Sequence, residues 1–329
     1  MNMEFIKVKE EELKEITMFL IDAKIIFHPS ISPQGRPNFL NQKGRKNILI
    51  LDRNILTPFI SLLKKGELKD DYLLKVVGSI MFWSQINNLS VTSGLALSEY
   101  AYHKKGNLEA SLENDLFLKS FNHYSPTVWL EMAMGRLKGI EVMHVDILNK
   151  YDFNKEYNHY KMHYLEMLKI AQLYFDRSLS IEEKIIGFHK WVYNNLMVGR
   201  YTISYLALLL AGRINTFHKT CNLNQVLDRC RNQAWDLSYL SLWSTFYFNE
   251  DKSEANYLFA TLDKGLKQVF TGIHDARTDL HSSLFGDKIG TKINESMTDT
   301  FKKRDVPIIP NEVIDRLTQE ELEKLNRLI

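Results

Sequence analysis

Cysteine is scarce in this chain of 329 residues, which carries only Cys221 and Cys230. A pair of cysteines is too few for a disulfide framework, and neither has ligand partners at the spacing of a zinc finger or a zinc ribbon. Proteins without disulfides are typical of reducing compartments. We therefore expect a cytoplasmic protein.

Long hydrophobic runs and an excess of one charge are also missing. The most apolar stretch, Tyr201–Gly212, is shorter than the roughly 20 residues that span a membrane, and the chain begins with acids where a signal peptide has its apolar core. Lysine and arginine number 42 against 40 aspartates and glutamates, a net charge of +2. No membrane partner is indicated, and only a local basic patch would identify a nucleic-acid partner.

Several enzyme signatures are absent from the sequence. There is no P-loop, no Gly-x-Gly-x-x-Gly after a strand, no His-Glu-x-x-His and no Gly-x-Ser-x-Gly. These absences weigh against nucleotide hydrolases, dinucleotide-binding enzymes, zincins and esterases. What is present is a composition of 45% hydrophobic and 25% charged residues, enough to bury the core of one large domain or two ordinary ones.

The most informative feature is an acid that closes a short apolar run. Ile48–Leu51 is the pattern of a strand buried on both faces, as in a parallel sheet, and Asp52 follows it directly. A second run, Tyr257–Leu262, leads to Asp263 in the same way. Ligands of parallel sheets gather at the carboxyl ends of the strands. The sequence therefore predicts acids at a common binding edge.

Helical periodicity fills much of the remaining chain. The expected helices cover about Glu10–Ala23, Ile55–Leu63, Tyr72–Ile86, Ser93–His103, His159–Phe175 and a segment opened by the capping box Ser180–Glu183, and Asn222–Phe248 is expected to form one or two more. Ile140–Asp146 alternates like a strand. Val306–Pro310 is typical of a short edge strand, because proline lacks a donor for the sheet ladder.

The amount of helix between the strands predicts an insertion into an α/β core. We place a helical amino-terminal arm at residues 1–46, the core at 47–310 with the insertion at about 151–223, and a carboxy-terminal helix at 311–329, with Thr318–Glu321 as its capping box. The polar segment Thr271–Arg304 is too long for an ordinary connection. We expect it to form a lid or a mobile binding loop.

Further acids follow the same order along the chain. Glu99 lies on an expected helix after the first strand, and Asp236 falls in the later helical region. Together with Asp52-Arg-Asn54 and Thr261-Leu-Asp263, this series resembles the PIN-like nuclease superfamily. Its members carry Asp-x-Asn after the first strand, a glutamate on a following helix, an aspartate opening a later helix, and Thr/Ser-x-Asp after the next strand. Arg53 departs from the small residue usual in that family.

The resemblance implies a three-layer α/β/α fold around a central parallel sheet and an activity that hydrolyses phosphodiester bonds, usually in RNA. It assigns Asp52 and Asp263 as central ligands of Mg²⁺ or Mn²⁺, Asp236 as a further or water-mediated ligand, and Glu99 as a ligand or an orienter of the attacking water. Crowded carboxylates favour such a hard cation. Asn54 and Thr261 would support them, Thr261 by a hydrogen bond to a neighbouring carboxylate.

We accordingly expect a metal-dependent endoribonuclease with RNA as substrate and single-stranded DNA as the alternative. A toxin or phage-defence effector with an inhibitor or partner protein fits this activity. A structure-specific DNA nuclease and a PIN-like scaffold that binds without cutting are the rival interpretations. The simplest alternative is that Asp52 caps a helix while Glu99 and Asp236 are ordinary surface charges. His159 and His163, four residues apart on a helix, are interpreted as a polar face rather than a metal site.

Overall fold

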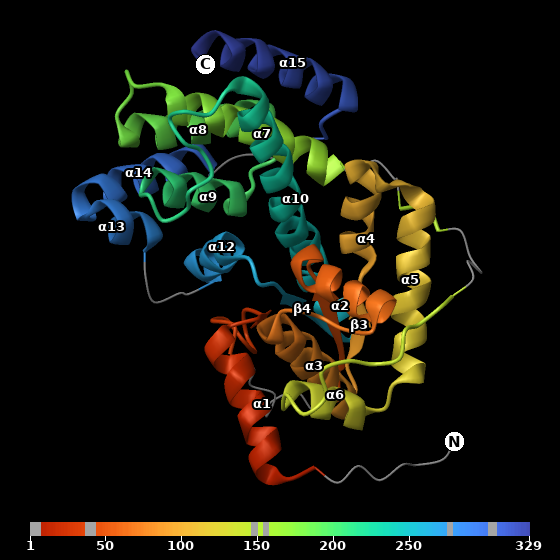
Figure 1. Ribbon diagram of the computed structural model, residues 1–329. Helices are drawn as coiled ribbons and strands as arrows, with labels where there is room; N and C mark the ends of the chain where they lie inside the picture. The colour runs from red at the N-terminus through yellow and green to blue at the C-terminus, as the bar shows by residue number, and fades with distance from the viewer. Residues whose placement is uncertain (1–7, 37–43, 146–150, 154–157, 275–278, 302–307) are drawn as a thin grey trace. The chain divides into compact units, whose positions relative to one another are not determined.

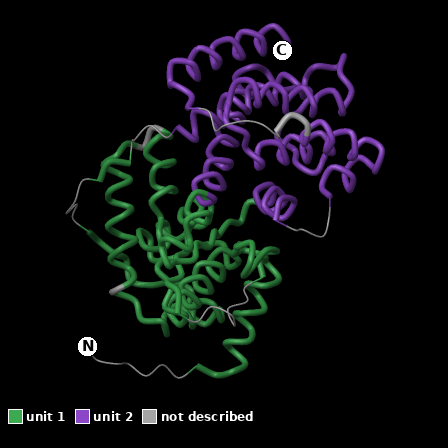
Figure 2. Tube along the Cα trace, turned by 180° about the vertical axis from the view of Figure 1, so that it is seen from behind, with its two compact units in different colours: residues 1–155, 245–263 green, residues 156–244, 264–329 purple. Residues whose placement is uncertain are grey.

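The computed structural model describes residues 8–36, 44–145, 151–153, 158–274, 279–301 and 308–329. The chain divides into two units, and each is made of separate stretches of sequence. The first unit holds residues 1–155 and 245–263, and the second holds 156–244 and 264–329. Figure 2 shows the two units in different colours. Each unit is described by itself below.

The first unit is built on a mixed sheet in an α/β arrangement (Figure 1). Its strands are β1 (Ile26–Phe27), β2 (Lys46–Leu51), β3 (Ser90–Thr92) and β4 (Ala255–Ala260), in the spatial order β1-β4-β2-β3. β2 runs parallel to both β3 and β4, whereas β1 runs antiparallel to β4. The expected α/β class is therefore confirmed, with an antiparallel edge on an otherwise parallel sheet.

The central strands are the apolar runs that the sequence indicates. Leu49, Ile50 and Leu51 are buried in succession on β2, and Leu258 and Phe259 are buried in succession on β4. Runs of this kind suit strands that are covered on both faces. Leu51 pairs with Ala260, so the two strands end at the same level.

The sheet also differs from the sequence expectation. The amino-terminal segment expected as an arm supplies β1, and β3 comes from a segment not expected to be a strand. The predicted strand Ile140–Asp146 is wrong for the described residues 140–145, which hold no strand and donate backbone hydrogen bonds to Leu63 and Gly66. For the predicted edge strand Val306–Pro310, residues 306–307 lie outside the described part, and 308–310 form no strand.

Helices make up most of the rest of the first unit. They are α1 (Glu10–Ala23), α2 (Arg53–Lys65), α3 (Asp71–Ile86), α4 (Gly94–Tyr100) with a π-helical turn η1 (Ala101–Lys105), α5 (Gly106–His123), α6 (Pro126–Ala133) and α11 (Glu250–Ser253). α3 packs against α6 at Gly78, where an added Cβ would lie 2.7 Å from the backbone nitrogen of Ala133. Helix α2 contacts α3, α4 and α5.

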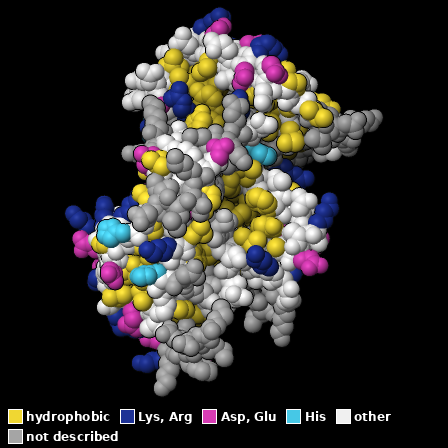
Figure 3. All heavy atoms as spheres, turned by 90° about the vertical axis from the view of Figure 1, so that its right-hand side faces the viewer, with side chains coloured by type: hydrophobic (Ala, Val, Ile, Leu, Met, Phe, Trp, Pro, Cys, Tyr) yellow, Lys and Arg dark blue, Asp and Glu magenta, His cyan; other side chains and the backbone are white. Residues whose placement is uncertain are grey.

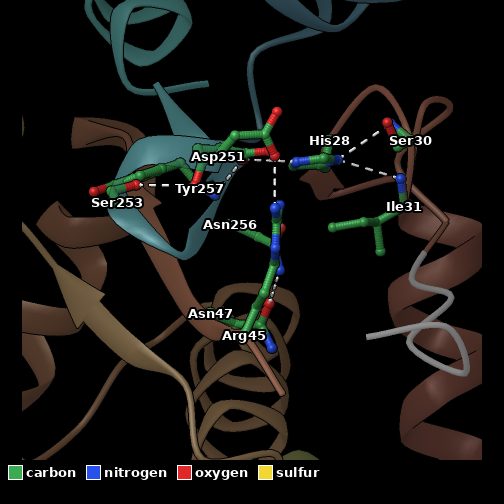
Figure 4. Close-up of polar contacts among 10 residues, drawn as sticks. His28, Ser30, Ile31, Arg45, Asn47, Asp251, Ser253, Asn256 and Tyr257 are labelled. Carbon is green, nitrogen blue, oxygen red and sulfur yellow. Dashed lines mark hydrogen bonds and ion pairs between the residues drawn. The ribbon is translucent and has the colours of Figure 1, made fainter. Parts of the chain in front are cut away.

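A polar network at the amino ends of β2 and β4 fixes that edge of the sheet (Figure 4). His28 Nδ1 accepts the backbone N–H groups of Ser30 and Ile31, so His28 Nε2 carries the proton and donates to Glu250 Oε1 over 2.9 Å. The same oxygen accepts the backbone N–H of Tyr257 over 2.7 Å. The buried Glu250 carboxylate thus has partners from two separate strand segments.

The second unit is helical. Its helices are α7 (Asn158–Phe175), α8 (Ile181–Asn195), α9 (Arg200–Leu210), α10 (Leu223–Tyr247, whose last residues count with the first unit), α12 (Lys264–His274), α13 (Leu280–Phe285), α14 (Asp287–Phe301) and α15 (Asn311–Leu328). The Ser180–Glu183 capping box is present at the start of α8. α15 packs on α7, and α14 packs on α8.

Two sequence predictions in this unit are wrong. The segment expected as a lid or loop, Thr271–Arg304, is helical over much of its described length, in α12, α13 and α14. Asp279 opens α13 by accepting the backbone N–H of His281, so the polar composition of this segment includes a helix cap. The final helix begins at Asn311, so the Thr318–Glu321 motif lies inside it.

No helix in the described ranges combines the length and the apolar character needed to cross a membrane.

Candidate functional site

The carboxyl ends of β2 and β4 bring two distant sequence motifs together within the first unit. Asp52 follows β2 and Thr261 follows β4, and Thr261 Oγ1 donates a 2.5 Å hydrogen bond to Asp52 Oδ2. Asp52 is 2% exposed and Thr261 1%. The hydrogen bond expected of Thr261 to a neighbouring carboxylate is present.

Asn54 completes the link between the motifs. Its Nδ2 donates to Asp52 Oδ2 over 2.5 Å and approaches Thr261 Oγ1 at 3.1 Å, while its Oδ1 accepts the backbone N–H of Leu262 over 2.9 Å. Thr261 Oγ1 also accepts the backbone N–H of Asp263 over 2.9 Å. Both Asp-x-Asn and Thr-x-Asp, the motifs that the sequence singles out, take part in this one network.

Asp52 stands at the start of α2 without capping it through its side chain. The capping interpretation would have used the carboxylate on the unpaired N–H groups of the first helical turn. The carboxylate is bonded by the side chains of Asn54 and Thr261, and the backbone N–H of Arg53 also lowers its pKa. Its burial is therefore tied to the neighbouring strand end.

The electrostatic setting of Asp52 is that of a crowded acidic site. The pKa of Asp52 is raised from 3.8 to about 7. Burial is the largest cause, the hydrogen bond from Thr261 acts in the opposite direction, and the negative charges of Glu99 and Asp263 add to the rise. A buried carboxyl beside like charges holds its proton unless a cation compensates. A positive charge near Asp52 would therefore favour its ionised form.

Glu99 lies on helix α4, as expected, and belongs to the first unit with Asp52 and Asp263. Glu99 Oε1 is 3.8 Å from His103 Nε2, one helical turn further along the chain. Burial lowers the pKa of His103, so this imidazole favours its neutral form. His103 is not among the residues that the sequence predicts for the site, although its spacing of four from Glu99 is the available signal.

Arg53, the departure from the family pattern, has a structural partner. It donates from Nη1 to Glu113 Oε2 over 2.8 Å, and its guanidinium lies 4.1 Å from the ring centre of Tyr100. The buried Glu113 also accepts from Lys64 Nζ over 3.1 Å. Arg53 therefore joins α2 to α4 and α5. Nothing in the local sequence of Glu113 marks it as the acceptor.

Asp236 is placed differently from the expectation. It lies in the interior of α10, not at the start of a helix, and accepts a 2.7 Å hydrogen bond from Gln233. The prediction of an aspartate opening a helix is wrong, because α10 runs unbroken from Leu223 to Tyr247. Asp236 belongs to the second unit, whereas the other acids belong to the first. Its role beside them stays a prediction.

The donor chemistry of the strand-end acids suits a hard divalent cation. Among the residues that the structure describes, no group of three or more His, Cys, Asp or Glu side chains is placed to hold a metal ion together. Mg²⁺ is often bound through one or two carboxylates, with water and phosphate oxygens filling the other positions. Asp52 and Asp263 are two carboxylates of the type that Mg²⁺ binds. The raised pKa of Asp52 shows that its charged form lacks a compensating positive charge.

Comparison of the chain with models of protein families, with curated proteins and with solved structures gives no match.

Proposed function

We propose that the first unit is a PIN-like nuclease core that hydrolyses phosphodiester bonds, with RNA as its substrate and Mg²⁺ or Mn²⁺ as its cofactor. The observation that carries the proposal is the single network at the carboxyl ends of β2 and β4, in which Asp52, Asn54, Thr261 and Asp263 are linked. The position matches the place where parallel sheets bind ligands.

The electrostatics of the network support a cation-dependent activity. Asp52 is buried, and its pKa is raised to about 7 by burial and by Glu99 and Asp263. Holding several acids around a buried one is unfavourable, and the binding of a cation relieves that repulsion. The proposed three-layer PIN-like arrangement would place these acids along one edge of the sheet.

Asp52 and Asp263 are the proposed holders of the ion, and Glu99 orients the attacking water. Asn54 and Thr261 fix the Asp52 carboxylate through the hydrogen bonds to Oδ2, so its other oxygen keeps a defined direction. A bound divalent ion supplies a water of lowered pKa and polarises the phosphoryl group. The buried setting of Asp52 keeps bulk water from weakening these interactions.

The distribution of surface charge does not distinguish RNA from DNA as the substrate. On the face drawn in Figure 3, basic and acidic side chains are interspersed instead of forming one field of a single sign, as the net charge of +2 suggests. RNA remains the proposed substrate through the resemblance, with single-stranded DNA as the comparison.

The proposal is tested with the full chain and labelled single-stranded RNA, structured RNA and single-stranded DNA. Each substrate is incubated with Mg²⁺, with Mn²⁺ and with a chelator. We expect cleavage of RNA that requires the ion and that falls by at least about 100-fold in Asp52→Asn and in Asp263→Asn, since each variant removes a charge that holds the ion at the reacting phosphate.

Asp71→Asn is the matched control, because Asp71 is an exposed acid of the same unit that pairs with Lys138. It should cleave like the wild type. Ion binding has a separate readout, a rise in melting temperature with Mn²⁺ that is lost in Asp52→Asn. Cleavage that persists in both site variants contradicts the assignment. Inactivity of the wild type on every substrate and ion favours a scaffold that binds without cutting.

A further inference from the structure

A hydrogen-bonded series of Ser, His and Glu lies in the second unit, apart from the residues used above. His163 Nε2 is 2.6 Å from Ser241 Oγ, and His163 Nδ1 is 2.7 Å from Glu166 Oε2. His163 and Glu166 stand one turn apart on α7, and Ser241 stands on α10. A nucleophile, a base and a group that orients the base, each within hydrogen-bond reach, are the signature of an activated serine.

The partners determine where the protons lie. The Glu166 carboxylate only accepts, so His163 Nδ1 carries the proton and donates to it. Nε2 is then left with its lone pair and accepts the Ser241 hydroxyl proton. Thr202 Oγ1 donates a second hydrogen bond to Glu166 Oε2 over 2.8 Å. This arrangement keeps His163 in the tautomer that a general base needs.

Burial distinguishes the base from the nucleophile. His163 is 2% exposed, Glu166 1% and Thr202 0%, so the base and its supports are shielded from competing water. Ser241 is partly exposed. Within its unit, Ser241 is therefore more exposed to solvent than its base.

We propose that Ser241 is the nucleophile of a second reactive centre, which is acylated by small carboxylic esters. Ser241 Oγ forms a bond to the ester carbonyl carbon while its proton passes to His163 Nε2. The bond between that carbon and the leaving alkoxide oxygen then breaks, and the alkoxide takes the proton from His163. Water repeats the sequence on the acyl-serine, which releases the carboxylic acid and restores Ser241.

The absence of Gly-x-Ser-x-Gly does not bear on this centre. That motif places a serine on a sharp turn between a strand and a helix, whereas Ser241 lies within a helix. The serine and its base come instead from different helices, separated by 78 positions in the sequence. Such a centre is recognised by geometry and by the roles of its atoms.

The test uses the full chain with p-nitrophenyl acetate and with a fluorophosphonate probe. We expect one label per chain, on Ser241 by peptide mass spectrometry, and a burst of p-nitrophenol. Ser241→Ala should abolish both. His163→Ala should lower the labelling rate by at least about 100-fold, the usual range for loss of a general base, and added imidazole should restore part of it. If His163→Ala does not fold, His163→Gln tests the same base with less loss of volume.

Ser244→Ala is the matched control, because Ser244 lies on the same helix and its hydroxyl donates to the backbone oxygen of Ser241. It should label like the wild type. Glu166 is a positioning residue, so Glu166→Gln should change the pH profile of labelling as well as its rate. Absence of label in the native wild type, label at another residue, or label that survives Ser241→Ala would overturn the proposal and leave a structural network.

Discussion

At the scale of single residues, Asp52 is a buried carboxyl whose surroundings disfavour its charged form. Its carboxylate is 2% exposed and lies near Glu99 and Asp263, both of which raise its pKa. An aspartate selected only for stability would be exposed or paired with a base. The unfavourable placement therefore points to a binding role at this position.

The same residue gives a prediction for the pH dependence of stability. The folded-state pKa of about 7 lies above the ordinary value of 3.8, so the native state keeps a proton that the unfolded chain has released. The contribution of Asp52 to the free energy of unfolding is largest at low pH and is lost as pH rises through 7. Asp52→Asn removes this titration, and from pH 5 to pH 8 it should gain about 2–3 kcal/mol relative to the wild type.

Urea unfolding of the two proteins at pH 5 and pH 8, in the presence of a chelator, measures this difference. Other acids titrate in both proteins and cancel in the comparison. Stability differences that stay equal at the two pH values would contradict the burial of an ionisable Asp52. Asp71→Asn, an exposed acid on α3, should show no comparable change.

At the scale of elements, two helical glycines have opposite surroundings: one lies in a close contact between helices and the other has open space beside it. Gly78 on α3 lies against α6, where an added Cβ would meet the Ala133 nitrogen at 2.7 Å and the Trp129 carbonyl oxygen at 3.0 Å. Gly187 on α8 has no atom within 4 Å of such a Cβ. The backbone of α6 cannot yield as a side chain would, so the two sites respond in opposite directions.

Gly78→Ala should lower the free energy of unfolding by about 1–3 kcal/mol through overpacking. Gly187→Ala should raise it by up to about 1 kcal/mol, because alanine favours the helix and restricts the unfolded chain. Chemical unfolding at one pH measures both. Equal effects of the two substitutions would show that α3 and α6 do not approach so closely.

Strands and helices could be predicted from the sequence where a single local pattern, such as an apolar run or a capping box, was clear. The apolar runs before Asp52 and Asp263 indicated β2 and β4, and the Ser180 capping box indicated α8. β1 and β3 are too short and too dependent on their neighbours for such a signal: Ser90 and Thr92 are exposed, so β3 has little apolar pattern. The alternation at Ile140–Asp146 failed because pattern alone does not provide a pairing partner.

The candidate site was predictable in part for the same reason. Asp-x-Asn and Thr-x-Asp each follow an apolar run typical of a buried parallel strand, and the carboxyl ends of such strands share one edge of the sheet, so their meeting could be anticipated. The placement of Asp236 depends on where α10 begins, and helix boundaries are weakly encoded. The hydrogen bond of Ser241 to His163 joins residues 78 apart, and no local feature marks that pairing.

For the molecule as a whole, the two proposed centres share no residue. One network is built from Asp52, Asn54, Thr261 and Asp263 in the first unit, and the other from His163, Glu166, Thr202 and Ser241 in the second. Each unit has its own core and its own polar network. The chemistry of one centre should therefore be separable from that of the other.

Asp52→Asn should lose RNA cleavage and keep fluorophosphonate labelling at the wild-type rate, while Ser241→Ala should show the reverse. Parallel cleavage and labelling assays on the same preparations measure both activities. If either substitution removes both, a global loss of folding or a dependence of one centre on the other is the cause, and circular dichroism distinguishes the two.

The strand order means that β2 is synthesised well before its neighbour β4. β4 lies between β1 and β2, and Asn256 of β4 bonds to Asn47, 209 positions earlier. At the usual pace of about 5–20 residues per second, the ribosome needs roughly 10 to 40 s to reach β4 after β2. During that interval the apolar run Ile48–Leu51 lacks this partner, so one edge of the strand stays unpaired until residues 255–260 have been synthesised.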